Sequence, residues 1–208
     1  MEKIGDFVLG RVVKALPDRD SYLILINGTQ PFAVLPKQYA DRPYRVKDTI
    51  SAAVYRLGEM YPVLSQRCPH YIRRISESIL RPVLEAGEVR IRRVATGLGS
   101  PFVKIALESE EGVDPVKLCV PYRQSYASYT RLMVSFVRYS TDLGRFIRNA
   151  LAPAPVDLIR RIDVFGEEQM ARVLVPAECK GYFLGKGGLN VALASKLTSM
   201  AIELRTEP

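Results

Sequence analysis

The stretch of this sequence best suited to chemistry is residues 185–188, GKGG, which supplies three glycines and one lysine. Glycine has no Cβ, so its backbone can approach an anion closely and can adopt positive φ angles. An amphipathic run at residues 189–197 follows directly. This places the turn at the start of a helix, where backbone N–H groups and the helix dipole favour anions. Because Lys186 adds a full positive charge, the pattern predicts a site that binds phosphate groups.

Enzyme chemistry is poorly supported by the same sequence. A P-loop is excluded because only three residues separate Gly181 from Gly185, and a glycine rather than Ser or Thr follows Lys186. The single histidine is His70, and no G-x-S-x-G motif is present. Its spacing from Cys68 matches no zinc pattern. We therefore predict no enzyme activity, no metal and no cofactor.

The composition narrows the class of partner. The chain has 208 residues, 48% hydrophobic and 25% charged, with a net charge of +8. This excess favours a polyanionic partner, nucleic acid before an anionic membrane. No apolar run approaches the roughly 18 residues that span a membrane, and the N-terminus lacks the apolar region of a signal peptide. The three cysteines lie far apart, which is typical of free thiols in a reducing compartment. We predict a cytoplasmic protein that does not bind membranes.

Short strands are expected before the helices that carry this turn. The predicted strands are residues 7–16, 21–26 and 31–36, with two more within 42–66. Asn27-Gly28 is a strong hairpin signal, and Gly58-Glu59 marks another turn. Five short strands within about 60 residues predict a small β-barrel of the OB type.

From residue 69 the pattern becomes a repeated order of helices and strands. The first block comprises a helical run at 69–87 that Pro82 kinks or splits, strands at 88–97 and 101–109, a short helix from Pro115, a loop VPYRQ, a helical stretch to about Met133 and a strand at 134–140. The second comprises a helix at 142–151, strands at 156–165 and 169–176, a short helix at 177–184, GKGG, a helix at 189–197 and a strand at 200–204. We predict an α+β multidomain chain divided at 1–66, 67–151 and 152–208, with the helix at 142–151 packing at the seam.

The repeated order, with a G-x-x-G turn between its last two helices, resembles a KH domain of the bacterial type (type II). The resemblance implies that the turn clamps the backbone of about four nucleotides, while an adjoining apolar groove takes the bases. In the first block the corresponding turn is degenerate. It reads Pro121-Tyr122-Arg123-Gln124, in which proline removes a backbone donor and glutamine disfavours positive φ. We expect the close phosphate clamp to be lost there.

The whole chain resembles the S1-KH-KH RNA-binding core of the NusA family, bacterial factors of transcription elongation, termination and antitermination. The stretches that carry the resemblance are VLSQRCPHYIRRI, VDPVKLCV, FIRNALAPAPV and LGKGGLNVALASKLT. Bacterial members usually carry an N-terminal domain that binds RNA polymerase, whereas this chain starts at the barrel and ends without acidic repeats. We expect a fragment or a short paralogue, and the second case leaves polymerase binding open.

Charge and aromatic residues extend the candidate RNA-binding set. Residues 67–151 hold 14 basic against 8 acidic residues, which supplies +6 of the net charge; a solvated basic face is the alternative. RNA-binding S1 relatives use exposed aromatics and cations on one sheet face, the alternative being aromatics buried in the core. The candidates are Gly185, Lys186, Gly187, Gly188, Asn190 and Lys196 in the second KH domain, Arg123, Arg131, Arg90, Arg92 and Arg93 in the first, and Tyr22, Phe32 and Arg11 in the barrel.

Together these features predict a non-enzymatic protein that binds single-stranded RNA and acts in transcription elongation, pausing, termination or antitermination. The nascent transcript is the expected partner, and RNA polymerase or other transcription factors remain open as further partners. The alternatives are an RNA-binding subunit of an exosome-like nuclease, a ribosome-assembly or RNA-chaperone factor, and a protein-interaction module with reduced RNA binding.

Overall fold

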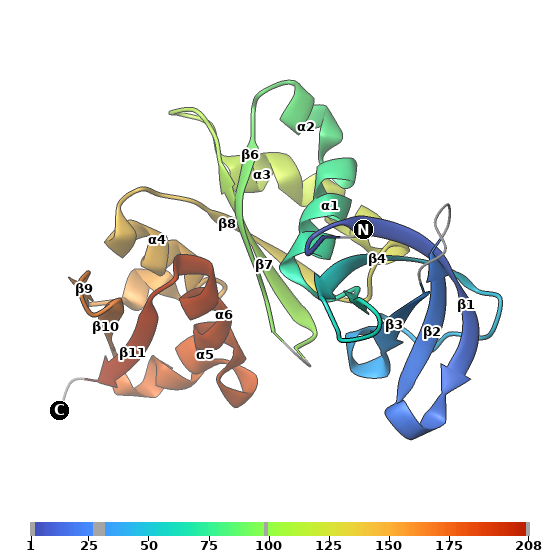
Figure 1. Ribbon diagram of the computed structural model, residues 1–208. Coiled ribbons are helices and arrows are strands. Elements are labelled where there is room, and N and C mark those ends of the chain that lie inside the picture. The colour runs from blue at the N-terminus through green and yellow to red at the C-terminus, as the bar shows by residue number, and fades with distance from the viewer. Residues whose placement is uncertain (1–2, 27–31, 98–99, 207–208) are drawn as a thin grey trace. The chain divides into compact units, whose positions relative to one another are not determined.

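The computed structural model describes residues 3–26, 32–97 and 100–206 (Figure 1). The chain forms two compact units. The first, here the barrel unit, comprises Met1–Ile79 and Gln124–Leu132. The second, the two-sheet unit, comprises Leu80–Arg123 and Met133–Pro208. The three-part division of the chain stays a prediction.

The barrel unit contains five strands closed in the order β1-β2-β3-β5-β4. They are β1 (Phe7–Leu16), β2 (Ser21–Ile26), β3 (Phe32–Pro36), β4 (Thr49–Arg56) and β5 (Val63–Ser65), with 3-10 turns η1 (Pro17–Arg19) and η2 (Lys37–Tyr39) between them. Alternate residues point inward, and Ile24, Leu35 and Leu64 are fully buried in the core. The predicted OB-type barrel is confirmed. The predicted turn at Asn27-Gly28 lies outside the described residues.

Helix α1 (Pro69–Ile79) belongs to the barrel unit. Its Tyr71 and Ile72 are buried, and the Tyr71 ring stacks on Phe7 of β1 with 5.9 Å between ring centroids. Burial raises the pKa of Tyr71 to about 12, so its hydroxyl stays protonated. The segment Gln124–Leu132 is tied to the barrel through Asp41, whose Oδ1 accepts a hydrogen bond of 2.7 Å from the backbone N–H of Arg131.

The two-sheet unit contains two three-stranded sheets of the same design. The first has the order β6-β7-β8, formed by β6 (Arg90–Thr96), β7 (Phe102–Glu108) and β8 (Met133–Arg138); the second has the order β11-β10-β9, formed by β9 (Arg161–Phe165), β10 (Met170–Val175) and β11 (Ala201–Thr206). In each sheet the central strand pairs antiparallel with the strand before it and parallel with the strand after it. The predicted repeat and the predicted α+β class are confirmed.

The remaining helices and 3-10 helices are α2 (Arg81–Glu85), α3 (Pro115–Cys119), η3 (Val120–Ser128), α4 (Leu143–Ala150), η4 (Val156–Leu158), η5 (Ala177–Cys179), α5 (Lys180–Leu184), η6 (Lys186–Gly188) and α6 (Leu189–Thr198).

The order of these elements is the predicted one, and the structure differs from the prediction at three places. The expected loop VPYRQ is part of the 3-10 helix η3, and Met133 begins β8 instead of ending a helix. The expected strand from residue 156 begins only at Arg161. The helical run splits at Leu80, before Pro82, whose ring and missing N–H oppose an uninterrupted helix.

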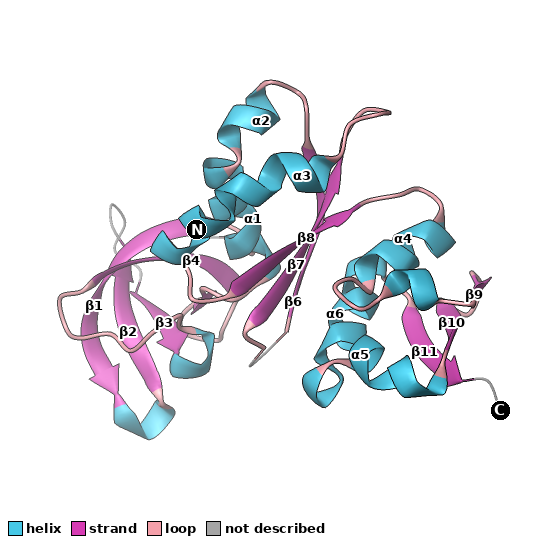
Figure 2. Cartoon of the chain, turned by 180° about the vertical axis from the view of Figure 1, so that it is seen from behind, coloured by secondary structure: helices cyan, strands magenta, loops and turns pink. Residues whose placement is uncertain are grey.

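One hydrophobic core joins both sheets of the two-sheet unit. Figures 1 and 2 show α4, α5 and α6 on one side of the β9–β11 sheet. Phe146 of α4, Phe183 of α5 and Leu197 of α6 are fully buried there, together with Ala106 of β7. Helices α4 and α6 therefore hold the two halves of the repeat together. Over the described residues, no helix is long and apolar enough to cross a membrane.

Candidate nucleic-acid interface

The GKGG turn connects α5 to α6 through three glycines at positive φ. Gly185 has φ 69° and ψ 173°, Gly187 has φ 60° and ψ 25°, and Gly188 has φ 75° and ψ 8°. The Gly188 N–H donates to the Gly185 carbonyl at 3.0 Å, which closes the turn. L-amino acids with a Cβ rarely adopt these conformations, so the sequence requires glycine at these positions.

The glycines differ in what surrounds them. A Cβ built on Gly187 or Gly188 meets nothing within 4 Å, whereas one built on Gly185 lies 2.8 Å from the Cβ of Asn190. Gly187 and Gly188 thus present open backbone, and the neighbouring Lys186 side chain is exposed. This part of the turn can be approached closely by a phosphate, while Gly185 is packed against α6.

A groove of about 410 Å³ lies beside the turn, within the two-sheet unit. Gly185 and Lys186 of the turn and the start of α6 form one wall, and the adjacent strands β7 and β8 form the other, while Gly187 and Gly188 lie just outside the lining. The lining residues are Phe102, Val103, Lys104, Arg123, Met133, Val134, Ser135, Pro153, Tyr182, Gly185, Lys186, Leu189, Asn190 and Leu193. Both halves of the repeat therefore contribute to a single groove.

The groove combines apolar surface with two exposed cations. Phe102, Met133 and Tyr182 are 39%, 53% and 68% exposed. Large apolar or aromatic side chains are more often buried, so this surface is unusually apolar. Arg123 and Lys186 are exposed in the same lining. Aromatic faces stack on nucleobases, and cations bind phosphates. The arrangement suits a single strand whose bases lie on the apolar wall and whose backbone passes the turn.

Asn190 and the buried Lys104 connect the two walls of the groove. Lys104 is 3% exposed, and its Nζ donates a hydrogen bond of 2.7 Å to Asn190 Oδ1. The Asn190 Nδ2 donates to the carbonyls of Leu151 at 2.8 Å and Phe183 at 3.0 Å. Its amide thus makes hydrogen bonds inside the protein, next to the turn. The predicted contact of Asn190 with RNA stays a prediction.

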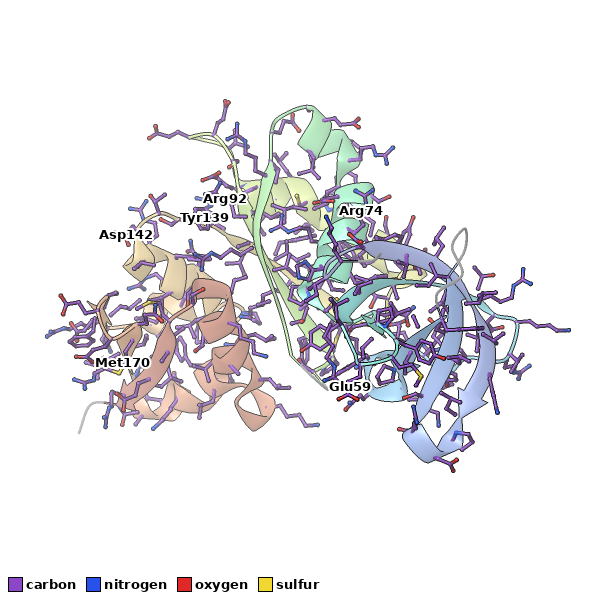
Figure 3. The ribbon with its side chains drawn as sticks, viewed as in Figure 1. Glu59, Arg74, Arg92, Tyr139, Asp142 and Met170 are labelled. Carbon is purple, nitrogen blue, oxygen red and sulfur yellow. The ribbon has the colours of Figure 1, made fainter. Side chains whose placement is uncertain are left out.

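Two predicted arginines of β6 make contacts inside the two-sheet unit. The Arg92 guanidinium carbon lies 5.0 Å from the ring centroid of Tyr139, and Figure 3 shows both side chains labelled side by side. Arg93 Nη1 donates to the Leu197 carbonyl at 3.2 Å and to Ser199 Oγ at 2.9 Å. Arg93 therefore joins β6 to the end of α6. Neither arginine lines the groove beside the turn.

The remaining predicted cations of this unit are also separate from the groove lining. Lys196 Nζ donates to the carbonyl of Thr96 at 3.2 Å, which again connects α6 to β6. Arg90 is exposed and lies near Glu108. Their predicted roles in RNA binding stay predictions, and of the five basic residues predicted in the first KH domain only Arg123 lines the groove.

The barrel residues divide by which face of the sheet they occupy. Tyr22 is 4% exposed in the core, and its hydroxyl accepts a hydrogen bond of 3.1 Å from the Tyr44 N–H. The prediction that Tyr22 stacks on RNA is therefore wrong, because its side chain points into the barrel. Phe32 is 36% exposed, and Arg11 and Phe32 both pair with Leu25, so they share the outer face of β1, β2 and β3. The predicted contacts of Arg11 and Phe32 with RNA stay predictions.

Arg131 is exposed but belongs to the barrel unit, whereas Arg123 belongs to the two-sheet unit. The prediction from the sequence grouped these two arginines into one basic surface, but they lie in different compact units. The sequence also missed Phe102, Met133 and Tyr182 as groove residues. Of these three, only Tyr182 could have been found from the sequence, because it stands three residues before the turn.

Comparison with known proteins agrees with this geometry. Residues 143–208, which contain the turn, match the family described as "NusA-like second KH domain". The chain is 28% identical over 201 residues to "Transcription termination/antitermination protein NusA" of Halalkalibacterium halodurans, covering 91% of this chain and 51% of that protein. Against the proteins of the same description from Borreliella burgdorferi and Thermus thermophilus, the identities are 27% and 28%, covering 98% and 97% of this chain and 43% and 53% of those proteins. The chain thus spans about half the length of these curated relatives, and its resemblance to the NusA core is confirmed.

Proposed function

We propose that this chain binds single-stranded RNA in the groove beside the GKGG turn, and that it acts on the nascent transcript in elongation, pausing, termination or antitermination. The observation that carries the proposal is the open backbone of Gly187 and Gly188, with the exposed Lys186, at the edge of an apolar groove. The names of the relatives support the role in transcription.

The two walls of the groove bind different parts of the RNA. At the turn, phosphates approach glycine backbone at the N-terminus of the ten-residue helix α6, where the helix dipole favours anions. On the opposite wall, a base stacks on Phe102 of β7 and packs against Met133 of β8, and Tyr182 of α5 offers a second aromatic face. The hydroxyls of RNA and the bases themselves supply further contacts.

The degenerate turn of the first KH domain takes a supporting role. Residues 120–128 form a 3-10 helix, and Pro121 lacks the backbone N–H that a phosphate clamp uses. Arg123 nevertheless lines the groove that Lys186 also lines. The first half of the repeat thus supplies a cation and an apolar wall to the clamp of the second half.

A binding experiment with matched variants tests the groove. Lys186→Asp with Gly187→Asp places negative charge where phosphates approach. Lys180→Asp with Gly181→Asp makes the same substitutions in α5, at a position outside the groove lining where a Cβ on Gly181 meets nothing within 4 Å. We expect fluorescence anisotropy with a labelled single-stranded RNA of about 12 nucleotides to show a loss of roughly tenfold or more for the first variant only. Equal affinities for both variants, with equal thermal melting, refute the groove as the site.

A transcription assay tests the consequence of binding. Adding the protein to a bacterial RNA polymerase that transcribes a template with a hairpin terminator should change pausing or read-through, and the Lys186→Asp, Gly187→Asp variant should not. RNA binding without any such change favours a role in ribosome assembly. Degradation of labelled RNA in the presence of divalent metal favours association with a nuclease, and absence of RNA binding favours a protein-interaction module.

A further inference from the structure

Lys104 is a charged residue in a buried part of strand β7. It lies in the middle of β7, where residues 103–107 are buried, and it is itself 3% exposed. Its Nζ donates to three oxygens, namely the carbonyls of Ala150 and Ala152 and the side-chain oxygen of Asn190. An ammonium group has three hydrogens, so its donors match these three acceptors.

The acceptors come from separate segments of the two-sheet unit. Ala150 ends α4, Ala152 follows it, and Asn190 is in the first turn of α6. The Asn190 amide also donates to Phe183 of α5, and its Cβ is the atom closest to the position of a Cβ on Gly185. Lys104 thereby connects β7 to the end of α4 and, through Asn190, to the GKGG turn.

The charge of Lys104 is held by neutral groups. In the sheet its register partners are Ala95 of β6 and Ser135 of β8. The other ionisable residues in the groove lining are Arg123 of η3, Lys186 of η6 and Tyr182 of α5, and the lining contains no carboxylate. The carbonyls at the C-terminus of α4 carry the negative end of the helix dipole, which favours the cation.

We propose that Lys104 is a positioning residue of the RNA groove, which acts through Asn190 to fix the GKGG turn, and that the turn is held only while Lys104 is protonated. Its part in RNA binding rests on the proposed function above, whereas its effect on the turn does not. A neutral amine has two hydrogens and one lone pair. Of the three acceptors, one then loses its hydrogen and faces the lone pair.

The proton on Lys104 is expected to leave near pH 8, well below the usual range of a lysine. Burial lowers the pKa of Lys104 from 10.5 to about 8. Phosphates bound in the groove favour the protonated form because they bring negative charge near the ammonium. RNA binding at a pH above this value should therefore take up protons, and the affinity should fall as the pH rises.

The first test uses the protein without RNA. Carbon-detected NMR of the Gly185, Gly187 and Gly188 carbonyls should show a titration with a midpoint near pH 8 in the parent protein. It should be lost in Lys104→Met and unchanged in Lys117→Met, a control that removes an exposed lysine of α3. Absence of the titration in the parent, or its persistence in Lys104→Met, overturns the proposal.

A second variant covers the case in which Lys104→Met does not fold. Asn190→Ala retains Lys104 and its two backbone acceptors but removes the connection to the turn. The titration of the Gly185 and Gly187 carbonyls should then shrink, while that of the Ala150 and Ala152 carbonyls remains. Equal titration of all four carbonyls in Asn190→Ala and the parent refutes the action through Asn190.

The third test measures proton uptake on RNA binding. Calorimetric titration with the same RNA at pH 8.3, in two buffers of different ionisation enthalpy, should show uptake of about half a proton by the parent and of almost none by Lys104→Met. Between pH 7 and pH 9 the parent affinity should fall by up to about tenfold. Absence of uptake by a parent that binds RNA refutes the link to RNA. If the parent binds no RNA at any pH, the proposed function fails, and the NMR titration still decides the positioning role.

Discussion

Gly185 and Gly187 are expected to respond in opposite ways to the same substitution. Gly185→Ala places a methyl group at φ 69° and ψ 173°, a backbone region occupied almost only by glycine, where strain costs about 1–3 kcal/mol. The new Cβ also lies 2.8 Å from Asn190 Cβ and 3.1 Å from its backbone nitrogen, so α6 has to shift. A shift of Asn190 weakens its hydrogen bonds to Leu151 and Phe183, at about 1 kcal/mol each.

These terms give a loss of about 3–5 kcal/mol in the free energy of unfolding for Gly185→Ala. Gly187→Ala adopts the left-handed helical region, at a cost of about 1 kcal/mol, and its Cβ meets nothing within 4 Å. When both variants are folded, we expect Gly187→Ala to lose more RNA affinity than Gly185→Ala. The new methyl group of Gly187→Ala occupies the open backbone that a phosphate approaches. We expect a loss of roughly threefold to tenfold in affinity for Gly187→Ala.

Urea unfolding followed by circular dichroism measures the first effect, and RNA anisotropy measures the second. Both variants are compared with the parent under conditions in which each is fully folded. Equal unfolding free energies for Gly185→Ala and Gly187→Ala would show that the contact with Asn190 does not constrain the turn. Parent-like RNA affinity for Gly187→Ala would show that phosphates do not approach that face.

Three further predictions follow from the same structure. Because the pKa of Lys104 is lowered from 10.5 to about 8, the folded state is penalised while this lysine is charged, and the penalty is relieved as the pH rises through this range. The unfolding free energy of the parent relative to Lys104→Met should therefore rise by up to about 3 kcal/mol between pH 8 and pH 10.5, and urea titrations showing no such rise would contradict the burial of a charged lysine. Arg123→Ala should reduce the slope of log K against log salt for single-stranded RNA by about 0.7, and an unchanged slope in filter binding at several salt concentrations would remove Arg123 from the phosphate path. Arg131→Ala is the matched variant in the barrel unit and shows whether that unit also contacts RNA. Phe32→Ala should weaken RNA binding by about 1–3 kcal/mol with little effect on thermal melting, whereas Tyr22→Ala should mainly lower the melting temperature; the reverse result would mean that the outer barrel face does not stack on bases.

The sequence alone was sufficient for the order of elements and for the turn. Short strands with turn residues between them predicted the barrel, and the change to helical spacing at residue 69 predicted the repeat, because both signals are local and periodic. The GKGG turn was equally readable, since its three positive φ angles demand glycine whatever the surroundings. Local conformation was misjudged at VPYRQ, where the 3-10 helix leaves no periodic signal.

Only the tertiary structure decided which side chains meet at the site. Tyr22 and Phe32 are both strand aromatics, yet one points into the barrel and the other outward, because side-chain direction alternates along a strand and depends on which face packs the core. Lys104 and Arg123 reach the groove of a turn more than 60 residues further along the chain, through the packing of α4 and α6 across both sheets. No local pattern encodes such a meeting, because it depends on how two sheets share one core. The sequence determined where a phosphate can be held, and the fold determined which residues surround it.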